Sequence, residues 1–416
     1  MSDQKDVVII GAGVVGICTA YYLLKRGRRV TVLDREGVCA GSSYGNGGLI
    51  VPSHSVPLAA PGAVVQGLKW MFSPESPFYI KPRPDLALIS WLWRFSRAAT
   101  KRRMHDSIPV LRDFTHASAV LHEELNASEE LDCHYERKGT LSLFRTAPAF
   151  EDAVKETQLL EEFDMRPRTL DGDSVRELEP LARKDVIGGV YHEDDAHMNP
   201  ADFVRALATR VESLGGVIEP GADVTGFERS GGRIAAVHTT LGDYVTEQVV
   251  LAAGSWSPGI ASGLGLKLPV QAGKGYSVTF SRPKVMPKLP VALGEARLGV
   301  TPMGPAVRLA GTLEFSGLNL TVKPRRVSAI RRAPAEYLDG FGAEDDGEVW
   351  CGMRPCTPDG LPIIGSPAGL SNLVVATGHA MIGVTLGPAT GKLVAQLIGG
   401  EDTLVAPAPF SPRRFG

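Results

Sequence analysis

The chain has 416 residues, of which 44 are basic and 46 acidic, and a formal net charge of −2. A charge so close to zero gives no bulk electrostatic attraction for nucleic acid, so we expect no nucleic-acid partner. The length suits two closely packed domains. No run reaches the ~18 apolar residues of a membrane span, and the polar N-terminus does not resemble a signal peptide, so a cytoplasmic location is expected.

The first motif is a glycine-rich turn between a strand and a helix. An apolar run over residues 7–10 predicts a strand buried on both faces. It is followed at once by Gly11, Gly13 and Gly16. In a dinucleotide-binding turn these glycines permit the bend, the approach of backbone to a pyrophosphate, and the packing of helix on strand. The helix is expected over about residues 14–26.

A second strand is expected over residues 29–33, and Asp34 stands at its end. A carboxylate at this distance from the glycines accepts hydrogen bonds from ribose hydroxyls. It would repel a 2′-phosphate, so NADP is disfavoured. NAD and FAD both remain open from this stretch alone.

Cysteine and histidine spacing predicts no metal site. Five cysteines are scattered without a CxxC pair, which is typical of reduced thiols in a cytoplasmic compartment. Cys351 and Cys356 lie close together but lack further ligands. His192 and His197 flank an acidic loop that has no third clear ligand. We expect incidental thiols and a solvated loop.

Residues 57–105 combine aromatic and basic side chains. The aromatic and sulfur-bearing side chains are Trp70, Met71, Phe72, Trp91, Trp93 and Phe95, and basic residues follow from Arg97 to Arg103. One interpretation is an amphipathic segment that contacts a membrane surface. The other, which we favour for each helix, is a helical pair with aromatics packed inward and a solvated basic face. Peripheral membrane contact through this segment stays open.

Further along, the pattern alternates between helices and strands. Residues 107–180 are mostly helical, with a strand near Gly139, and an amphipathic helix is expected to start near Pro200. Strands and hairpins follow, up to a buried strand at 248–252, and short strands dominate 266–350. A strand at 373–376 then precedes a glycine-rich turn and a final helix, whose N-terminus would present amides to an electron-rich group.

Nucleotide-binding elements therefore occur at the start of the chain, near residue 250 and at the C-terminus. An NAD-dependent Rossmann enzyme usually completes its nucleotide fold in one contiguous block. A fold split in this way favours a large flavin held along its whole length.

Several stretches resemble the FAD-dependent D-amino-acid dehydrogenase family, within the wider glycine oxidase and D-amino-acid oxidase group. They are VVIIGAGVVGICTAYYL, GSSYGNGGLIVPSHSVPLAAPG, LKWMF, GTLSLFRT, KGYSVTF, GMRPCTPDGLPIIG and TGHAMIGVT. The resemblance implies a mixed α/β fold, in which a split Rossmann-like FAD-binding domain is interleaved with an antiparallel-sheet substrate-binding domain. The FAD-binding domain would comprise 1–52, 191–265 and 351–416, and the substrate-binding domain 53–190 and 266–350.

The resemblance also implies FAD as the cofactor. The glycine turn would serve the pyrophosphate, residues 46–49 would run beside the flavin ring, and the turn at 378–385 would place a helix N-terminus by flavin O2. The cysteine that attaches FAD covalently in sarcosine-oxidase relatives corresponds to Gly352, so FAD is expected to be non-covalent. The residues expected at the cofactor are Gly11, Gly13, Val15, Gly16, Asp34, Arg35, Ser42, Ser43, Asn46, Gly47, Gly48, Leu49, Val224, Ala253, Gly254, Gly378, His379, Met381, Ile382, Gly383, Val384 and Thr385.

Three side chains are candidates for the reaction itself. Arg354 resembles the arginine that clamps the substrate carboxylate, so that Cα–H points at flavin N5. Tyr276 is either a second contact to the carboxylate or a half-buried strand residue. His54 either lines the substrate pocket or is exposed. The expected reaction is hydride transfer from Cα to N5, followed by hydrolysis of the imine, with no protein base.

Substrate and electron acceptor remain open. The stretch DDAHMNPADF departs from the usual family wording, so D-proline and cis-4-hydroxy-D-proline stand beside D-alanine as substrates. A quinone or another redox partner is the expected acceptor. The alternatives are an oxidase that passes electrons from a D-amino acid, glycine or an N-alkyl amino acid to dioxygen, and an FAD-carrying subunit without activity of its own. An NAD-dependent enzyme is a third, less favoured hypothesis.

Overall fold

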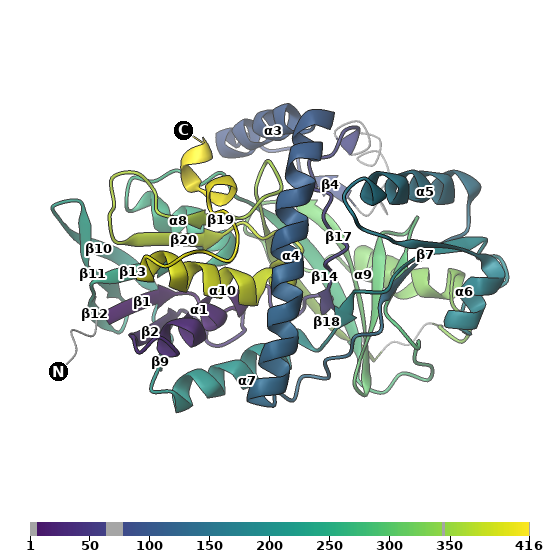
Figure 1. Ribbon diagram of the computed structural model, residues 1–416, viewed down its shortest axis with the longest axis horizontal. Helices are drawn as coiled ribbons and strands as arrows, with labels where there is room; N and C mark the ends of the chain where they lie inside the picture. Colours follow the sequence, from purple (N-terminus) through teal and green to yellow (C-terminus); the bar gives the residue numbers. More distant parts are fainter. Residues whose placement is uncertain (1–5, 64–77, 343–345, 416) are drawn as a thin grey trace.

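The computed structural model describes residues 6–63, 78–342 and 346–415 (Figure 1). Two sheets lie along the long axis of the molecule, and the long helix α4 (Lys101–Glu129) crosses in front of the junction between them. One half contains both chain termini and is built from parallel strands. The other half is mainly antiparallel. The mixed α/β architecture predicted from the sequence is confirmed.

The first sheet is assembled from three separated parts of the chain. Among the described residues its strand order is β19, β20, β13, β1, β2, β9, and all pairs are parallel except β19 with β20. The bounds are β1 (Asp6–Ile10), β2 (Arg29–Asp34), β9 (Val217–Pro220), β13 (Gln248–Leu251), β19 (Ile363–Gly365) and β20 (Leu373–Thr377). The strands expected at the start, near residue 250 and near residue 375 are thus neighbours in one sheet.

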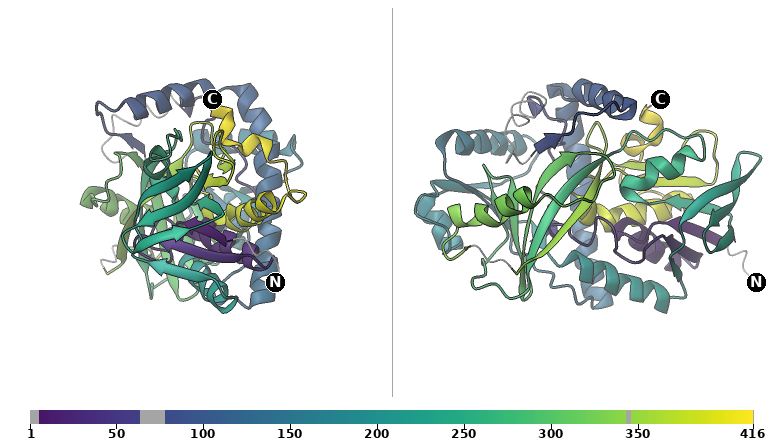
Figure 2. Two further views of the ribbon diagram at one scale, coloured as in Figure 1. Left: turned by 90° about the vertical axis from the view of Figure 1, so that its left-hand side faces the viewer. Right: turned by 180° about the vertical axis from the view of Figure 1, so that it is seen from behind.

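Helices cover one face of this sheet, and a small sheet with a short helix covers the other (Figure 2). Helix α1 packs closely on α10, because glycines of α10 face it: a Cβ on Gly391 would lie 2.5 Å from the backbone of Cys18. The covering elements are α1 (Val14–Leu24), α7 (Pro200–Ser213) and α10 (Gly383–Gly399) on one side, and α8 (Ser257–Ser262), β10 (Val224–Ser230), β11 (Arg233–Thr239) and β12 (Gly242–Val245) on the other.

The second sheet has the strand order β18, β14, β17, β16, β15, β5, β7, β6, and β4 pairs with β17. Its strands are β4 (Phe78–Ile80), β5 (Thr140–Phe144), β6 (Arg168–Asp171), β7 (Gly188–His192), β14 (Gln271–Phe280), β15 (Val291–Leu293), β16 (Leu298–Met303), β17 (Ala306–Phe315) and β18 (Glu348–Cys356). The expected domain boundaries at 190/191 and 350/351 fall inside β7 and β18. We therefore propose that the substrate-binding part extends to the ends of these two strands.

The two faces of this sheet differ in character. One face buries alternate residues such as Val278, Leu309, Val300 and Leu141 in a hydrophobic cluster. Helices α9 (Pro324–Arg332) and α6 (Gly172–Leu178) contribute to that cluster. The opposite face is turned toward the loop that follows β2, because a Cβ on Gly47 would lie 3.6 Å from Cβ of Ala310.

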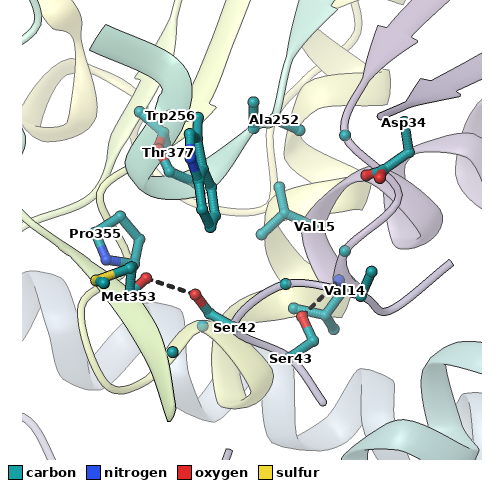
Figure 3. A pocket seen from close by; sticks show the side chains of 18 of the residues that line it. Val14, Val15, Asp34, Ser42, Ser43, Ala252, Trp256, Met353, Pro355 and Thr377 are labelled. Atoms are coloured by element: carbon teal, nitrogen blue, oxygen red, sulfur yellow. Dashed lines mark hydrogen bonds between the residues drawn. The ribbon is translucent and has the colours of Figure 1, made fainter. Parts of the chain in front are cut away.

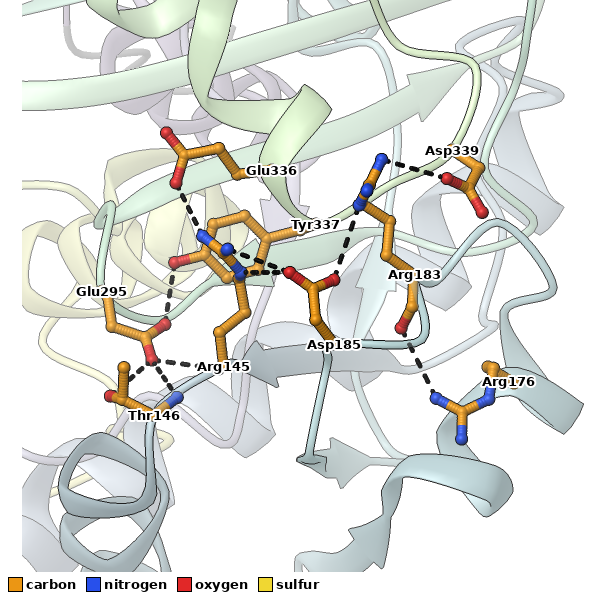
Figure 4. Close-up of polar contacts among 9 residues, drawn as sticks. All are labelled: Arg145, Thr146, Arg176, Arg183, Asp185, Glu295, Glu336, Tyr337 and Asp339. Carbon is orange, nitrogen blue, oxygen red and sulfur yellow. Dashed lines mark hydrogen bonds and ion pairs between the residues drawn. The ribbon is translucent and has the colours of Figure 1, made fainter.

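A network of charged groups fastens loops at the outer part of the second sheet (Figure 4). The Arg145 guanidinium pairs with Asp185 at 2.9 Å and with Glu336 at 2.7 Å. The Tyr337 hydroxyl donates to Glu295 at 2.8 Å. These groups join β5 to the segments before β7 and after α9, and they lie apart from the cavity described below, so their role is structural.

The aromatic segment expected over 57–105 is only partly described, and Trp70, Met71 and Phe72 lie outside the described residues. Helix α3 (Leu86–Ala98) buries Trp91, whose indole N–H donates to the carbonyl of Cys356 at 2.9 Å. Trp93 points outward and is 57% exposed. The interpretation that the aromatic side chains pack inward is therefore correct for only one face of helix α3. Further elements of the described ranges include α5 (Ala147–Glu161) and the pair β3 (Leu49–Ile50) and β8 (Ala196–His197).

None of the helices within the described ranges is both long and apolar enough to cross a membrane.

Candidate functional site

A cavity of about 390 Å³ lies at the carboxyl ends of β1, β2, β13 and β20 (Figure 3). In an open α/β sheet this edge is where ligands bind, because strand ends and helix N-termini converge there. In the figure Asp34 lies at one side of the cavity and Pro355 at the other. The expected cofactor residues that line it are Gly11, Gly13, Val15, Asp34, Arg35, Ser42, Ser43, Asn46, Val224, Ala253, Gly254, His379, Gly383 and Val384.

The glycine turn has the tight geometry that its sequence predicts. Gly11 has φ +111°, and a Cβ there would lie 2.6 Å from the carbonyl oxygen of Ala252. A Cβ on Gly16 would lie 1.8 Å from the Gly11 carbonyl oxygen. Gly16 therefore does not line the cavity but lets helix α1 pack against the strand. Helix α1 begins at Val14 with its N-terminus at the cavity, where it can bind an anion.

Asp34 is held by backbone donors and keeps acceptor capacity toward the cavity. Its Oδ2 accepts from the amide of Ala12 at 2.8 Å, and its Oδ1 accepts from the amides of Glu36 and Gly37, both at 2.9 Å. An ionised carboxylate has about four acceptor positions, so one remains for a ribose hydroxyl.

The serines of the loop after β2 already have partners within the protein. Ser43 Oγ accepts from the amide of Val14 at 3.0 Å, and Ser42 Oγ donates to the carbonyl of Met353. Asn46 donates to the Met381 carbonyl at 3.2 Å, so it fastens this loop to the turn before α10. Direct phosphate contacts by Ser42 and Ser43 stay a prediction.

The turn before α10 places the start of that helix at the cavity, as expected. His122 of α4 lies 3.0 Å through Nε2 from the carbonyl of Val384, and burial lowers its pKa to about 4. His379 is buried against Thr390 at 3.0 Å, and burial lowers its pKa to about 3. Both imidazoles are therefore neutral near pH 7. They position the turn and are poorly suited to supply a proton there.

Several residues expected at the cofactor do not line the cavity. Thr385 donates to the Leu49 carbonyl at 2.9 Å and accepts from the Val51 amide at 3.3 Å, so it joins β3 to α10. Gly378 has φ +82°, which the turn requires. The residues expected at the cofactor that do not line the cavity are Gly16, Gly47, Gly48, Leu49, Gly378, Met381, Ile382 and Thr385.

The cavity also has walls that sequence reasoning missed. Trp256 lines it, and the Arg35 guanidinium lies 4.3 Å from its ring centroid. Its position two residues after Gly254 was the available signal. Others come from the loop before α9 and from strand β18, and they are Leu318, Leu320, Trp350, Cys351, Met353 and Pro355. Gly352, which the sequence analysis had already related to cofactor attachment, lines the cavity with them.

Arg354 lies on the face of the second sheet that is turned toward the loop after β2, and its neighbours Met353 and Pro355 line the cavity although Arg354 itself does not. Its guanidinium lies across Gly275, where a Cβ would approach within 2.2 Å of Nη1. It donates to the carbonyl oxygens of Thr312 and Gly311, and it contacts no carboxylate in the part of the chain that the structure describes. Burial lowers the pKa of Arg354. A half-buried cation with spare N–H donors and no anion is prepared to bind one.

The other two reaction candidates do not join Arg354. Tyr276 is fully buried in the hydrophobic cluster on the opposite face of β14, so a contact with the substrate carboxylate is not supported, and the strand-residue alternative fits. His54 is exposed on the loop after β3. Its charge helps to lower the pKa of His192 to about 4, after burial as the main cause, so it lies near β7. Four strands separate β7 from β14.

The strand that carries Arg354 also bears on cofactor attachment. The Trp350 indole lies over Gly352, where a Cβ would come within 1.9 Å of the ring. Cys351 points to the other side and donates to the Leu320 carbonyl at 2.9 Å. Across the described ranges, no cluster of three or more His, Cys, Asp or Glu side chains that could hold a metal is found.

Comparison with known proteins identifies the family. The family model described as FAD dependent oxidoreductase matches residues 6–397. The chain belongs to this family. Its cofactor is therefore FAD, and the cavity fits it: glycines keep the turn open, Asp34 offers an acceptor, and two helix N-termini face the space.

The relatives of this FAD-dependent oxidoreductase extend over its whole length. It is 31% identical over 415 residues to the D-amino acid dehydrogenase of Allorhizobium ampelinum, covering 98% of both chains. It is 32% identical to that of Azorhizobium caulinodans, covering 98% of this chain and 99% of the relative. Among solved structures, glycine oxidase from Geobacillus kaustophilus has a TM-score of 0.79 at 23% identity, covering 98% of both chains. This last similarity supports the fold.

Proposed function

We propose that the enzyme oxidises the Cα–N bond of a D-amino acid, with Arg354 holding the substrate carboxylate. The observation that carries the proposal is the guanidinium itself, which lies beside the cavity with backbone carbonyls as its described partners and with N–H donors to spare. A bidentate pair with a carboxylate would compensate the buried charge and fix the orientation of Cα. The relatives named D-amino acid dehydrogenase support the choice of substrate.

FAD supplies the hydride acceptor for this reaction when it is bound. The protein contributes position and electrostatics. Arg354 orients the substrate, and the N-terminus of α10 at Gly383 and Val384 provides the positive end of a helix dipole to the cavity. The neutral imidazoles of His122 and His379 are already engaged with other groups. The substrate amine therefore enters deprotonated, and water hydrolyses the imine product after release.

Non-covalent FAD is part of the proposal. Gly352 stands where some relatives are expected to attach the flavin, and the Trp350 indole fills the space above it. Release of FAD from the denatured protein, followed by its separation from the chain, would support this. Flavin that remains with the denatured chain would contradict it.

The electron acceptor is proposed to be a membrane quinone. The outer face of α3 exposes Leu86, Ile89 and Trp93, at 84%, 56% and 57%, in helical register. The exposed basic residues Lys101, Arg102 and Arg103 follow at the start of α4. An apolar stripe beside basic side chains suits the surface of an anionic membrane.

This surface is connected to the cavity. The segment before α3 pairs with the end of β17, through the amide of Lys81 and the carbonyl of Phe315 at 3.0 Å. The loop that follows β17 carries Leu318 and Leu320, which line the cavity and are 58% and 50% exposed. An apolar acceptor leaving the membrane would thus meet apolar side chains at the cavity.

The test of the reaction is anaerobic reduction of the purified holoenzyme by D- and L-amino acids, followed by flavin absorbance. Bleaching by D-enantiomers alone is expected. Arg354→Met should lower kcat/KM by roughly 100- to 1000-fold, because a charged pair is lost, while FAD stays bound. Arg354→Lys should recover part of this loss. An unchanged Arg354→Met enzyme, or reduction by L-enantiomers only, would overturn the proposal.

A further inference from the structure

A row of small side chains crosses the middle of the second sheet on the face that carries Arg354. The strand register pairs Ser277 with Ala310, Ala310 with Gly299, Gly299 with Ala292, and Ala292 with Ser142. Directly paired residues point to the same face of a sheet. The residues between them on each strand are in the hydrophobic cluster of the other face. The row is therefore a strip of small side chains across β14, β17, β16, β15 and β5, which we call the trough.

The loop after β2 covers the trough at Ala310, because a Cβ on Gly47 would lie 3.6 Å from Cβ of Ala310, and the trough is more open from Gly299 onward. Ala310, Gly299, Ala292 and Ser142 are all half-buried although they lie on inner strands. A Cβ on Gly299 would meet a single atom within 4 Å, the carbonyl oxygen of Ala310 at 3.8 Å. From β17 to β5 the trough spans three strand spacings, or roughly 14 Å.

One end of the trough borders the cofactor cavity. Trp350, which lines the cavity, is the neighbour of Ser277 on β18. The Ser277 hydroxyl is fully buried, and among the described residues it has no hydrogen-bond partner. Such an unsatisfied donor at the closed end of the trough points to a polar group of a ligand.

Two arginines flank this end. Arg308 makes three hydrogen bonds through Nε and Nη1, to the hydroxyl of Thr279 and to the carbonyls of Tyr44 and Asn46, and these bonds tie it to the loop after β2. Arg354 is the one with donors to spare. An amino acid whose carboxylate binds Arg354 therefore has its polar end near Gly275, two residues from Ser277, and its side chain would extend past Ala310, beside the loop at Gly47, toward the open space at Gly299.

We infer that the trough holds the substrate side chain, and that the enzyme takes amino acids with a long or ring-shaped, uncharged side chain in preference to alanine. The inference rests on the proposed function and names its substrate class. The side chains along the trough are small and uncharged, so they leave room for bulk and offer no partner for a second charge. Burying a side chain the size of leucine there should improve kcat/KM over alanine by about 10- to 100-fold.

The first test compares D-alanine, D-leucine and D-phenylalanine in native and Gly299→Leu holoenzyme. Gly299 has no positive φ, so a leucine side chain can occupy the trough without backbone strain. The native enzyme should favour the larger substrates, and Gly299→Leu should reduce the ratio of kcat/KM for D-leucine over D-alanine by at least tenfold. Gly342→Leu is the matched control, because Gly342 lies outside the trough and a Cβ there meets nothing within 4 Å. A ratio that Gly299→Leu does not change would overturn the inference.

The second test needs no catalysis. Calorimetry of the oxidised holoenzyme with acetate, butanoate and hexanoate should show affinity that rises with chain length, and Gly299→Leu should abolish the rise. Ala292→Leu, one strand further, should affect hexanoate more than butanoate, and it replaces Gly299→Leu if that variant does not fold. An affinity that does not depend on chain length would overturn the inference that the trough binds the substrate side chain. If the carboxylates bind as expected but no amino acid reduces the flavin, the proposed function is wrong, while binding of an apolar chain in the trough is still supported.

Discussion

Two arginines on one face of the second sheet, Arg308 and Arg354, have different roles because their hydrogen-bond partners differ. Arg308 donates to two loop carbonyls and a threonine, so its charge serves to hold the loop after β2 against the sheet. Arg354 has two carbonyl partners and lies in space that Gly275 leaves open. Both are arginines in strands of the same sheet, and sequence alone does not separate them except through the motif around Arg354.

At the residue scale, Gly16 is the position where the glycine motif is least tolerant. In Gly16→Ala the new Cβ would collide with the Gly11 carbonyl oxygen at 1.8 Å. We expect α1 to be displaced and the cofactor to be lost, with flavin absorbance per chain at least tenfold lower after purification. Gly27→Ala is the control, since a Cβ there meets nothing within 4 Å; it should cost only about 1–2 kcal/mol and keep FAD. Full FAD content in Gly16→Ala would contradict the packing described.

Asp195 is a buried carboxylate with neutral partners. It accepts from the Ser53 hydroxyl at 2.7 Å, from the Ser53 amide at 3.2 Å and from the Thr140 hydroxyl. Burial raises its pKa from 3.8 to about 6, and the hydrogen bonds offset only part of that effect. The folded protein thus binds this proton more tightly than the unfolded chain does. Its contribution to stability is present below about pH 4 and is lost as pH rises through 6.

Asp195→Asn removes this titration and keeps a group that can bond both hydroxyls. The stability of the variant relative to native should therefore increase as pH rises from about 4 to 7, by at most about 3 kcal/mol. Melting temperatures of both proteins across this range provide the measurement, and their difference is the relevant quantity. A difference that is constant with pH, or that decreases, would contradict the assignment.

At the scale of elements, the α1–α10 contact determines whether both helix N-termini reach the cavity. Gly391→Ala would place a Cβ 2.5 Å from the Cys18 backbone, so α10 must move outward. We expect a loss of about 1–3 kcal/mol of stability together with weaker FAD binding. Thermal melting and FAD titration of the apoprotein test this, with Gly226→Ala in β10 as control, because a Cβ there makes only an ordinary contact at 3.7 Å. Unchanged FAD affinity would show that α10 tolerates the shift.

Strand parity favours one of the two alternatives given for Tyr276, a residue packed within a strand. The stretch KGYSVTF correctly predicted a strand, but a strand turns alternate side chains to opposite faces. Gly275 and Ser277 face the open side, and Tyr276 faces the hydrophobic cluster. Both faces of this strand are largely buried, so hydrophobic alternation gave no sign of which face meets the ligand. The decision comes from helix α9 and from the loop after β2, which cover opposite sides.

At the scale of the whole molecule, the outer stripe of α3 is the surface on which membrane contact is proposed. The double variant Leu86→Ser and Trp93→Ser should reduce binding of the holoenzyme to vesicles that contain anionic lipid by at least fivefold, because two exposed apolar anchors are lost. Co-sedimentation measures this. Ser90→Ala, on the same helix, is the control and should leave binding unchanged. Equal sedimentation of the double variant, or no binding by the native enzyme, would remove the membrane proposal.

By itself the sequence determined the positions of the main strands and helices of the nucleotide-binding half to within a few residues. Local backbone geometry is determined by neighbouring residues in the sequence. This holds for the apolar strand at 6–10, the glycine turn, the acid at 34 and the final helix at Gly383. The family motifs likewise led to FAD and to Arg354, and the family match confirms FAD.

Tertiary structure alone decided what several distant segments do together. The wall formed by Leu318, Trp350 and Trp256 joins residues from three regions, and the trough joins one small residue from each of five strands. Neither leaves a local pattern, because each member is an ordinary residue in its own strand or loop. Their role depends on strand order and register. Long-range strand pairing sets both, and neighbouring residues do not encode them.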